Sequence, residues 1–298
     1  MVSVNRVERF VAGRVGEIDR AAALYYDGTR HIGPCGSRAC TQRRGGGMMS
    51  LRLFCRRMLV LGILVCGAAP ALASDLLDAV KAEDLAGVQA ALAAGADANE
   101  PDPSTLTPLH MAAARGAMEI ATLLIEAGAD VAVEAGTGQG KAHALHLAAQ
   151  FDHPDMVRLL LDHGAAIDAA TTRGETALIL AAKSGYAGVA EVLLQAGADP
   201  LLGDAAYGDT ALYIASMHGY LEVVKLMLAK GADPNLRNPK SGETPLWVAA
   251  MDNRVEVIKT LLASGADPNI ADDKGKTPVQ MTGNSEVVEL LRQSGAKD

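Results

Sequence analysis

Residues 107–130 read TPLHMAAARGAMEIATLLIEAGAD, and their pattern returns along most of the chain. Thr107 stands immediately before Pro108, an order typical of a helix start with a hydroxyl cap and a first residue that needs no free N–H. In the second half, aliphatic residues lie three and four positions apart. Gly128 follows them and suits the left-handed position at a helix end. The stretch therefore predicts two short helices joined by a turn.

Both marks of this stretch recur at a nearly constant distance. Starts related to Thr-Pro-Leu-His occur at Thr107, His143, Thr176, Thr210, Thr244 and Thr277. Gly-Ala-Asp or a variant of it occurs at Gly95, Gly128, Gly164, Gly197, Gly231, Gly265 and Gly295. Successive starts lie 33 to 36 residues apart, and the glycines keep step with them until the shortened last unit. A regular internal repeat predicts a fold built by stacking one unit many times.

The period and the TPLH motif resemble those of the ankyrin repeat. The resemblance implies an all-α fold, an ankyrin-repeat solenoid of about seven helix-turn-helix repeats with short β-hairpin fingers. It covers most of residues 74–298, the predicted ankyrin-repeat domain, with repeats near 75–101, 102–137, 138–171, 172–204, 205–238, 239–271 and 272–296. The first repeat lacks the TPLH start and the last is shortened, as expected of terminal caps. Alanine pairs such as Ala112-Ala113 allow close helix stacking and explain why only 3% of the chain is aromatic.

Residues 48–73 have the pattern of a signal peptide. Three arginines precede an apolar run at 58–69, and Ala71-Leu72-Ala73 supplies the small residues of a cleavage site. The run is shorter than the roughly 20 residues that span a bilayer. We therefore expect cleavage after Ala73 and export to the periplasm of a bacterium. An uncleaved inner-membrane anchor is the alternative.

Residues 1–47 are rich in arginine and glycine and have no sustained periodicity. Because a signal peptide belongs at an N-terminus, we interpret them as a disordered, over-extended start and expect translation to begin at Met48 or Met49. A genuine cytosolic extension is the alternative.

Charge and cysteine are distributed unevenly between the two parts of the chain. Residues 1–73 hold 11 Lys and Arg against 4 Asp and Glu, whereas residues 74–298 hold 16 against 31, a net charge of −15. Such an acidic domain argues against nucleic acid as a partner. All four cysteines (Cys35, Cys40, Cys55 and Cys66) fall in the first part, which excludes disulfides, thiolate metal sites and a cysteine nucleophile from residues 74–298.

The sequence predicts no catalytic residue, metal site or cofactor. His110 and His146 hold the fourth place of the motif, where the resemblance implies a structural hydrogen bond between repeats. His143 and His146 have a spacing that could hold a metal, but no third ligand is placed with them. His153 and His163 are expected to be solvated.

Other polar features also have structural interpretations. The glycine-rich stretch 136–141 fails the phosphate-loop pattern and predicts a lengthened finger. Once per repeat an aspartate follows the helix-ending glycine, and we expect each to hydrogen-bond the nearby backbone of a turn. These aspartates are Asp97, Asp130, Asp168, Asp199, Asp233 and Asp267.

The resemblance implies that the finger tips and the exposed ends of the first helices carry recognition. Aromatic, methionine and basic residues gather at such positions in repeats three to six. The predicted protein-binding patch on the concave face is Phe151, Arg173, Lys183, Tyr207, Tyr213, Met217, Trp247 and Met251. The alternative for Tyr213 and Trp247 is that they fill space between repeats.

These observations predict a periplasmic ankyrin-repeat protein, similar to small exported bacterial members of the family, that binds another protein through its concave face. We expect a monomer without catalysis, small-molecule cofactor or nucleic-acid partner. Alternatives are an inhibitor or immunity protein that blocks a toxin or hydrolase, for which the −15 charge would suit a basic target; a membrane-anchored scaffold; a purely structural protein; and an enzyme or metal-dependent protein.

Overall fold

A computed structural model describes residues 69–137 and 140–297. The predicted extension 1–47 lies outside these residues, and so does the predicted leader 48–73 apart from residues 69–73, which belong to the first helix. In the described ranges none of the helices combines the length and the apolar character that crossing a bilayer requires.

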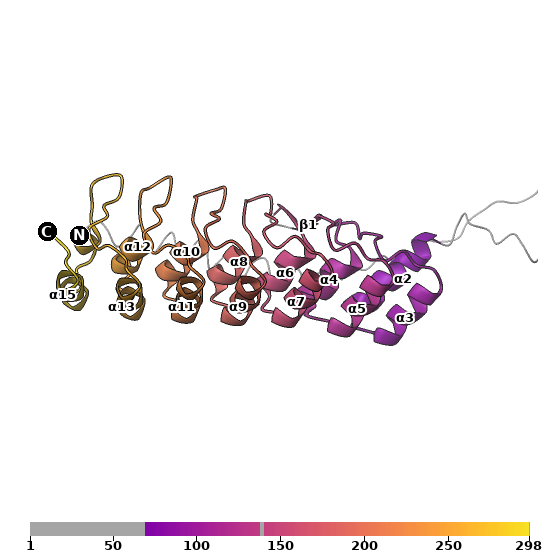
Figure 1. Ribbon diagram of the computed structural model, residues 1–298. Coiled ribbons are helices and arrows are strands. Elements are labelled where there is room, and N and C mark those ends of the chain that lie inside the picture. Colours follow the sequence, from indigo (N-terminus) through magenta and orange to yellow (C-terminus); the bar gives the residue numbers. More distant parts are fainter. Residues whose placement is uncertain (1–68, 138–139, 298) are drawn as a thin grey trace, which may run out of the picture. The chain divides into compact units, whose positions relative to one another are not determined.

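Seven consecutive helix pairs make up the described part of the chain (Figure 1). The pairs are α2 (Ala69–Lys81) with α3 (Leu85–Ala93), α4 (Pro108–Arg115) with α5 (Met118–Glu126), α6 (Ala144–Gln150) with α7 (Pro154–Asp162), α8 (Ala177–Ser184) with α9 (Ala187–Gln195), α10 (Ala211–His218) with α11 (Leu221–Ala229), α12 (Pro245–Met251) with α13 (Val255–Ala263), and α14 (Pro278–Met281) with α15 (Ser285–Gln293). We call the first member of each pair the inner helix and the second the outer helix.

The pairs stack in two layers. Each inner helix packs against the next inner helix, and each outer helix against the next outer helix. The loops between pairs form fingers that project beyond the inner helices (Figure 1). In the third repeat the finger is a hairpin of β1 (Ala135–Thr137) and β2 (Gly140–Ala142), in which Ala135 lies opposite Ala142. The predicted solenoid and the lengthened finger at 136–141 are both confirmed.

Small residues make the stacking possible. Ala112, Ala113, Ala148 and Ala149 are completely buried between neighbouring inner helices. Each motif leucine is buried behind them, as at Leu109, and contributes about 1.5–3 kcal/mol to folding. Because alanine lets helix backbones approach closely, the core needs few aromatic rings.

The inner helices begin and end as their sequences predict. Thr107 Oγ1 accepts the His110 backbone N–H at the start of α4, and Gly116 ends that helix with φ 67°. A Cβ at Gly116 would also lie 2.5 Å from Nδ1 of His153 in the next repeat. The His153 ring is half-buried with Nε2 3.2 Å from the Ala114 carbonyl oxygen, so the prediction that it is solvated was wrong. Gly116 is thus required both by the turn and by the neighbouring repeat.

A buried histidine joins each of two inner helices to the next finger. His110 Nε2 lies 3.2 Å from the Ala142 carbonyl oxygen, and His146 Nε2 lies 2.9 Å from that of Ala169. Because a carbonyl can only accept, Nε2 carries the proton in both rings. The predicted bonds between repeats are confirmed. Burial lowers the pKa of His110 to about 4 and also lowers the pKa of His146.

We predict that this pair makes the domain sensitive to acid. The pKa of His110 is about 6.5 in the unfolded chain and about 4 in the folded one. The unfolded state therefore binds more protons between these values, and stability falls as pH drops from about 6.5 towards 4. Urea unfolding should show a loss of about 2 kcal/mol from His110 alone between pH 7.5 and 5. His110→Gln should reduce this pH dependence, whereas His163→Gln, at an exposed site, should leave it unchanged. Equal slopes in the two variants would contradict the assignment.

The loops behind the fingers carry a second set of bonds between repeats. Asn99 Nδ2 donates to the Gly128 carbonyl oxygen at 3.0 Å, and its Oδ1 accepts the Asp130 N–H at 2.8 Å. Asn235 repeats this arrangement with the following repeat. The asparagines stand four residues after the Gly of Gly-Ala-Asp, a place that Leu201 holds in the fourth repeat.

The predicted aspartate turns are confirmed for five of the six residues. Their carboxylates accept the backbone N–H two residues ahead at 2.8–2.9 Å in Asp97, Asp130, Asp199, Asp233 and Asp267. Asp168 is different, because it stands at the asparagine position and accepts the Asp199 N–H of the next repeat at 3.1 Å.

We predict that Leu201→Asn stabilises the domain. Leu201 is 49% exposed, so its replacement loses little burial, while an asparagine there can make the bonds that Asn99 and Asn235 make. A gain of about 1 kcal/mol would raise the thermal midpoint by about 2–4 °C. The matched control is Leu202→Asn, which removes a similarly exposed leucine outside the asparagine position. A midpoint raised equally in both variants would contradict the mechanism.

Candidate protein-binding surface

Four of the eight predicted patch residues come from consecutive inner helices. Phe151 follows α6 directly, Lys183 lies in α8, Met217 in α10 and Met251 in α12. Phe151 is 50% exposed and Met251 36%, whereas Lys183 and Met217 are half-buried. Because these helices pack in order, the four side chains line up at the same end of the inner layer.

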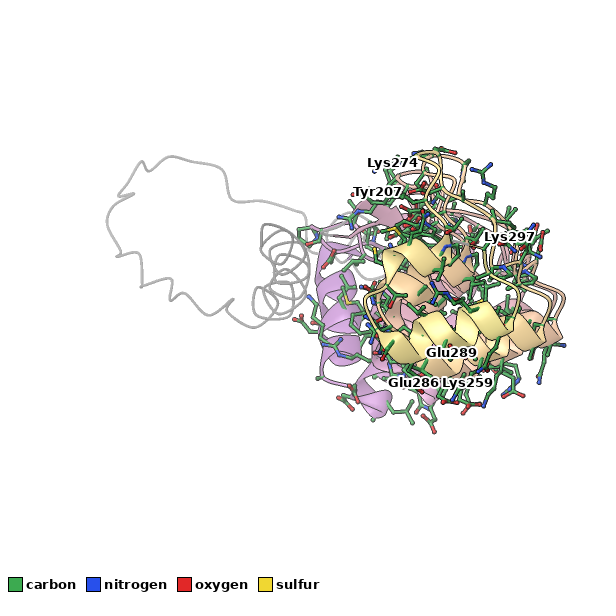
Figure 2. The ribbon with its side chains drawn as sticks, turned by 90° about the vertical axis from the view of Figure 1, so that its left-hand side faces the viewer. Tyr207, Lys259, Lys274, Glu286, Glu289 and Lys297 are labelled. Carbon is green, nitrogen blue, oxygen red and sulfur yellow. The ribbon has the colours of Figure 1, made fainter. Side chains whose placement is uncertain are left out.

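Arg173 and Tyr207 lie on the fingers of the fourth and fifth repeats, and both are exposed. Tyr207 is 51% exposed, and it appears beside the inner layer at the finger end of the molecule (Figure 2). The patch is therefore divided between the finger tips and the ends of the inner helices.

Tyr213 and Trp247 are not on this surface, which corrects their place in the predicted patch. They are only 8% and 5% exposed. Trp247 Nε1 donates to the Lys276 carbonyl oxygen at 3.0 Å, and the Tyr213 hydroxyl donates to Glu243. Both stand at the motif position that histidine holds in His110, so a larger ring makes the same kind of bond to the next finger. Their role is to fill space between repeats.

Lys183 forms an ion pair with Glu175, which lies on the finger of the same repeat. Glu175 is 7% exposed, so its carboxylate depends on this ammonium group for compensation. The Lys183 charge is therefore largely neutralised within the domain, and the half-buried side chain acts first as a support for the finger.

The sequence reasoning missed the residues that hold the finger tips. Asp204 Oδ1 accepts the N–H groups of Tyr207 and Gly208 at 2.6 and 3.1 Å. In the last finger Asp272 Oδ1 accepts those of Lys274 and Lys276 at 2.9 and 2.7 Å. The signal was present, because a short polar residue stands five or six positions before each motif start. These residues are Asp102, Thr171, Asp204, Asn238 and Asp272.

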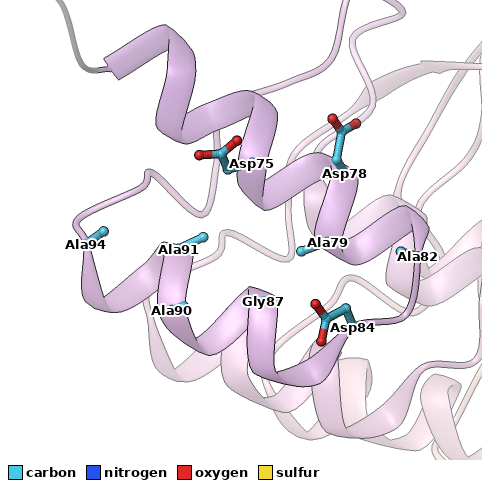
Figure 3. A pocket seen from close by; sticks show the side chains of 9 residues that line it. All are labelled: Asp75, Asp78, Ala79, Ala82, Asp84, Gly87, Ala90, Ala91 and Ala94. Carbon is cyan, nitrogen blue, oxygen red and sulfur yellow. The ribbon is translucent and has the colours of Figure 1, made fainter.

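A cavity of about 480 Å³ lies apart from this surface, between α2 and α3 of the first repeat (Figure 3). Asp75, Asp78 and Asp84 stand at its rim, and the remaining lining is alanine and Gly87. It contains no nucleophile or general base beyond these carboxylates. Across the described residues no group of three or more His, Cys, Asp and Glu side chains has a metal-binding arrangement.

Comparison with known proteins identifies the repeat. The family model for ankyrin repeats (3 copies) matches residues 76–171, 133–204, 166–238 and 212–298. The crystal structure of the ankyrin repeat domain of Bcl-3, a unique member of the IkappaB protein family, is similar with a TM-score of 0.66 and 28% identity, over 73% of this chain and 97% of that one.

Two curated relatives are similar over shorter stretches. The ankyrin repeat and KH domain-containing protein mask-1 of Caenorhabditis elegans is 40% identical over 113 residues, 38% of this chain and 4% of the relative. The ankyrin repeat and SOCS box protein 16 of Mus musculus is 38% identical over 102 residues, 33% of this chain and 22% of the relative. The matches thus span a small part of these longer proteins. With the family model matched from residue 76 to residue 298, the chain belongs to the ankyrin-repeat family.

Proposed function

We propose that this protein binds another protein through the inner-helix ends and the fingers, and that it does so in the periplasm without catalysis of its own. Ankyrin repeats are interaction scaffolds that are generally non-catalytic, and they imply a protein partner. One observation carries the proposal to this surface: Phe151, Tyr207 and Met251 are among only six large apolar side chains left exposed in the described part of the chain.

The exposed side chains continue into a row of apolar contacts. Leu180 and Met217 are half-buried on α8 and α10, between the helices that carry Phe151 and Met251. Scattered apolar residues are normal on a surface, but an aligned row of aromatic and methionine side chains is typical of a binding site. Methionine also adapts its shape to a partner at low cost. We infer that this row supplies the apolar contact.

The proposed compartment rests on the sequence pattern of residues 48–73. Basic residues, an apolar run and an Ala-x-Ala site stand in the order that directs export and cleavage. Residues 74–298 contain no cysteine, so exposure to an oxidising compartment would leave the domain chemically unchanged.

Export is tested by fractionating cells that express the protein natively with a C-terminal tag, followed by measurement of its intact mass. We expect a periplasmic species that begins at Ser74. A cytosolic species that retains residues 1–73 would overturn the proposed compartment, and a membrane-bound one would support the anchored alternative.

Binding is tested by capture from the same periplasmic extract with wild-type protein and the double variant Phe151→Ala/Met251→Ala. Both side chains are largely exposed, so their loss should change stability by less than about 0.5 kcal/mol. We expect a partner retained by the wild type to lose at least tenfold in affinity, since central aromatic contacts are each worth about 2 kcal/mol.

Two further variants make this result specific. Leu85→Ala removes an exposed leucine from α3, outside the row, and should leave capture unchanged. Trp247→Ala should instead destabilise the domain by about 3–5 kcal/mol, because it removes a buried ring and leaves a cavity. Equal loss of capture in Leu85→Ala and the double variant would contradict the proposed site.

A further inference from the structure

The fingers of the last four repeats have a charge opposite to that of the domain. They cover residues 171–175, 204–209, 237–243 and 272–276, and Asp273 is their single exposed acidic residue among the described positions. Their exposed basic residues are Arg173, Arg237, Lys240, Lys274 and Lys276, which we call the basic finger edge. In residues 74–298 as a whole acidic residues outnumber basic ones by 31 to 16.

The excess of positive charge arises because the acidic finger residues are used inside the fold. Asp204 and Asp272 are 4% and 7% exposed, and each carboxylate accepts two backbone N–H groups of its own finger. Glu175 is buried against Lys183. Asp273 lies 2.9 Å from Nη2 of Arg237. The carboxylates therefore build the fingers, and the basic side chains remain at the edge.

Bonds between fingers join this edge into a continuous row. Lys240 Nζ donates to the carbonyl oxygens of Ala205 and Ala206 in the preceding finger, at 3.0 and 2.6 Å. Arg237 Nη2 donates to that of Ala271 in the following finger at 3.2 Å. These bonds hold ammonium and guanidinium groups at fixed places beside exposed Tyr207.

The outer helices have the opposite character. Lys225 and Lys259 each form an ion pair with a glutamate three residues earlier on the same helix. Figure 2 shows Tyr207 and Lys274 at the finger end of the molecule, and Lys259, Glu286 and Glu289 at the outer helices away from it. Positive and negative side chains are thus sorted onto different faces.

We propose that the basic finger edge binds an acidic segment of the partner protein. The inference rests on the proposed function and names the chemistry of the partner. At physiological ionic strength the Debye length is about 8 Å, so a short segment on the fingers is attracted by the nearby basic groups and largely screened from the outer helices. A long nucleic acid or a membrane would also face the acidic remainder of the domain. The apolar row beside the fingers favours a polypeptide, whose side chains can be both acidic and apolar.

The test uses a fluorescein-labelled peptide of 20 glutamates and the full protein purified from its native host, with binding measured by anisotropy. We expect saturable binding that weakens at least tenfold between 50 and 300 mM NaCl. The triple variant Arg173→Gln/Lys240→Gln/Lys274→Gln should weaken it at least tenfold. The matched control Lys225→Gln/Lys230→Gln/Lys259→Gln has the same net charge and should change it less than twofold. Thermal midpoints of both variants establish that the fold is kept.

Carbodiimide crosslinking locates the contact independently of these variants. Carboxylates of the bound peptide should be joined to Lys240, Lys274 and Lys276 and not to Lys225 or Lys259. Absence of binding, equal weakening in the two triple variants, or crosslinks confined to the outer helices would overturn the proposal. Tighter binding of a 20-nucleotide oligo-dT or of phosphatidylglycerol vesicles would overturn the assignment to a protein segment.

The two proposals fail in different ways. If the finger edge binds the peptide but Phe151→Ala/Met251→Ala leaves capture unchanged, the apolar row is wrong and the basic finger edge stands. If the finger variants leave peptide binding unchanged while the double variant abolishes capture, the reverse holds.

Discussion

The structure depends on one recurring contact, the hydrogen bond that the fourth residue of each motif makes to the finger of the next repeat. His110, His146 and Trp247 donate to carbonyl oxygens there, and Tyr213 donates to the carboxylate of Glu243. The contact must be made by a ring long enough to cross from helix to finger and polar enough to satisfy a buried group. A helix pair alone would expose its alanine-rich face, so a repeat is stable only with its neighbours. The same bond that joins two repeats also fixes where the finger points.

The four residues differ in what they do with a proton, although they occupy one position. Burial keeps His110 and His146 neutral, because charging an imidazole inside the stack costs more than the carbonyl bond returns. Tyr213 is buried beside Glu243, and burial raises the pKa of its hydroxyl, so it remains a donor. Trp247 has no titration at all. Acid sensitivity therefore belongs to the third and fourth repeats, where the histidine bonds end, more than to the later interfaces.

The sequence predicted what periodicity controls. Helix pairs, caps, the closing glycines and the bond of the fourth residue all follow from a motif that returns every 33 to 36 residues. It did not resolve whether Tyr213 and Trp247 face a partner or a neighbouring repeat, because both interfaces favour the same aromatic residues. His153 was assigned to solvent since its contact, Ala114, lies in the preceding repeat. The tip-holding residues, such as Asp204, vary in identity and shift by one position, and a search for identical letters passes over them.

Net charge led the sequence interpretation towards a basic target, and the arrangement of that charge favours the opposite. A total of −15 describes the field far from the domain, where the positions of single groups no longer matter. Contact takes place within a few ångströms, and there the relevant charges are those left over after folding. In each finger the turn uses an acceptor, and aspartate is among the best acceptors for two adjacent N–H groups. Lysine and arginine have no acceptor and cannot serve in that turn, so they remain outside. An acidic repeat protein can in this way carry a basic edge because the hydrogen bonds of its fingers remove carboxylates from the surface.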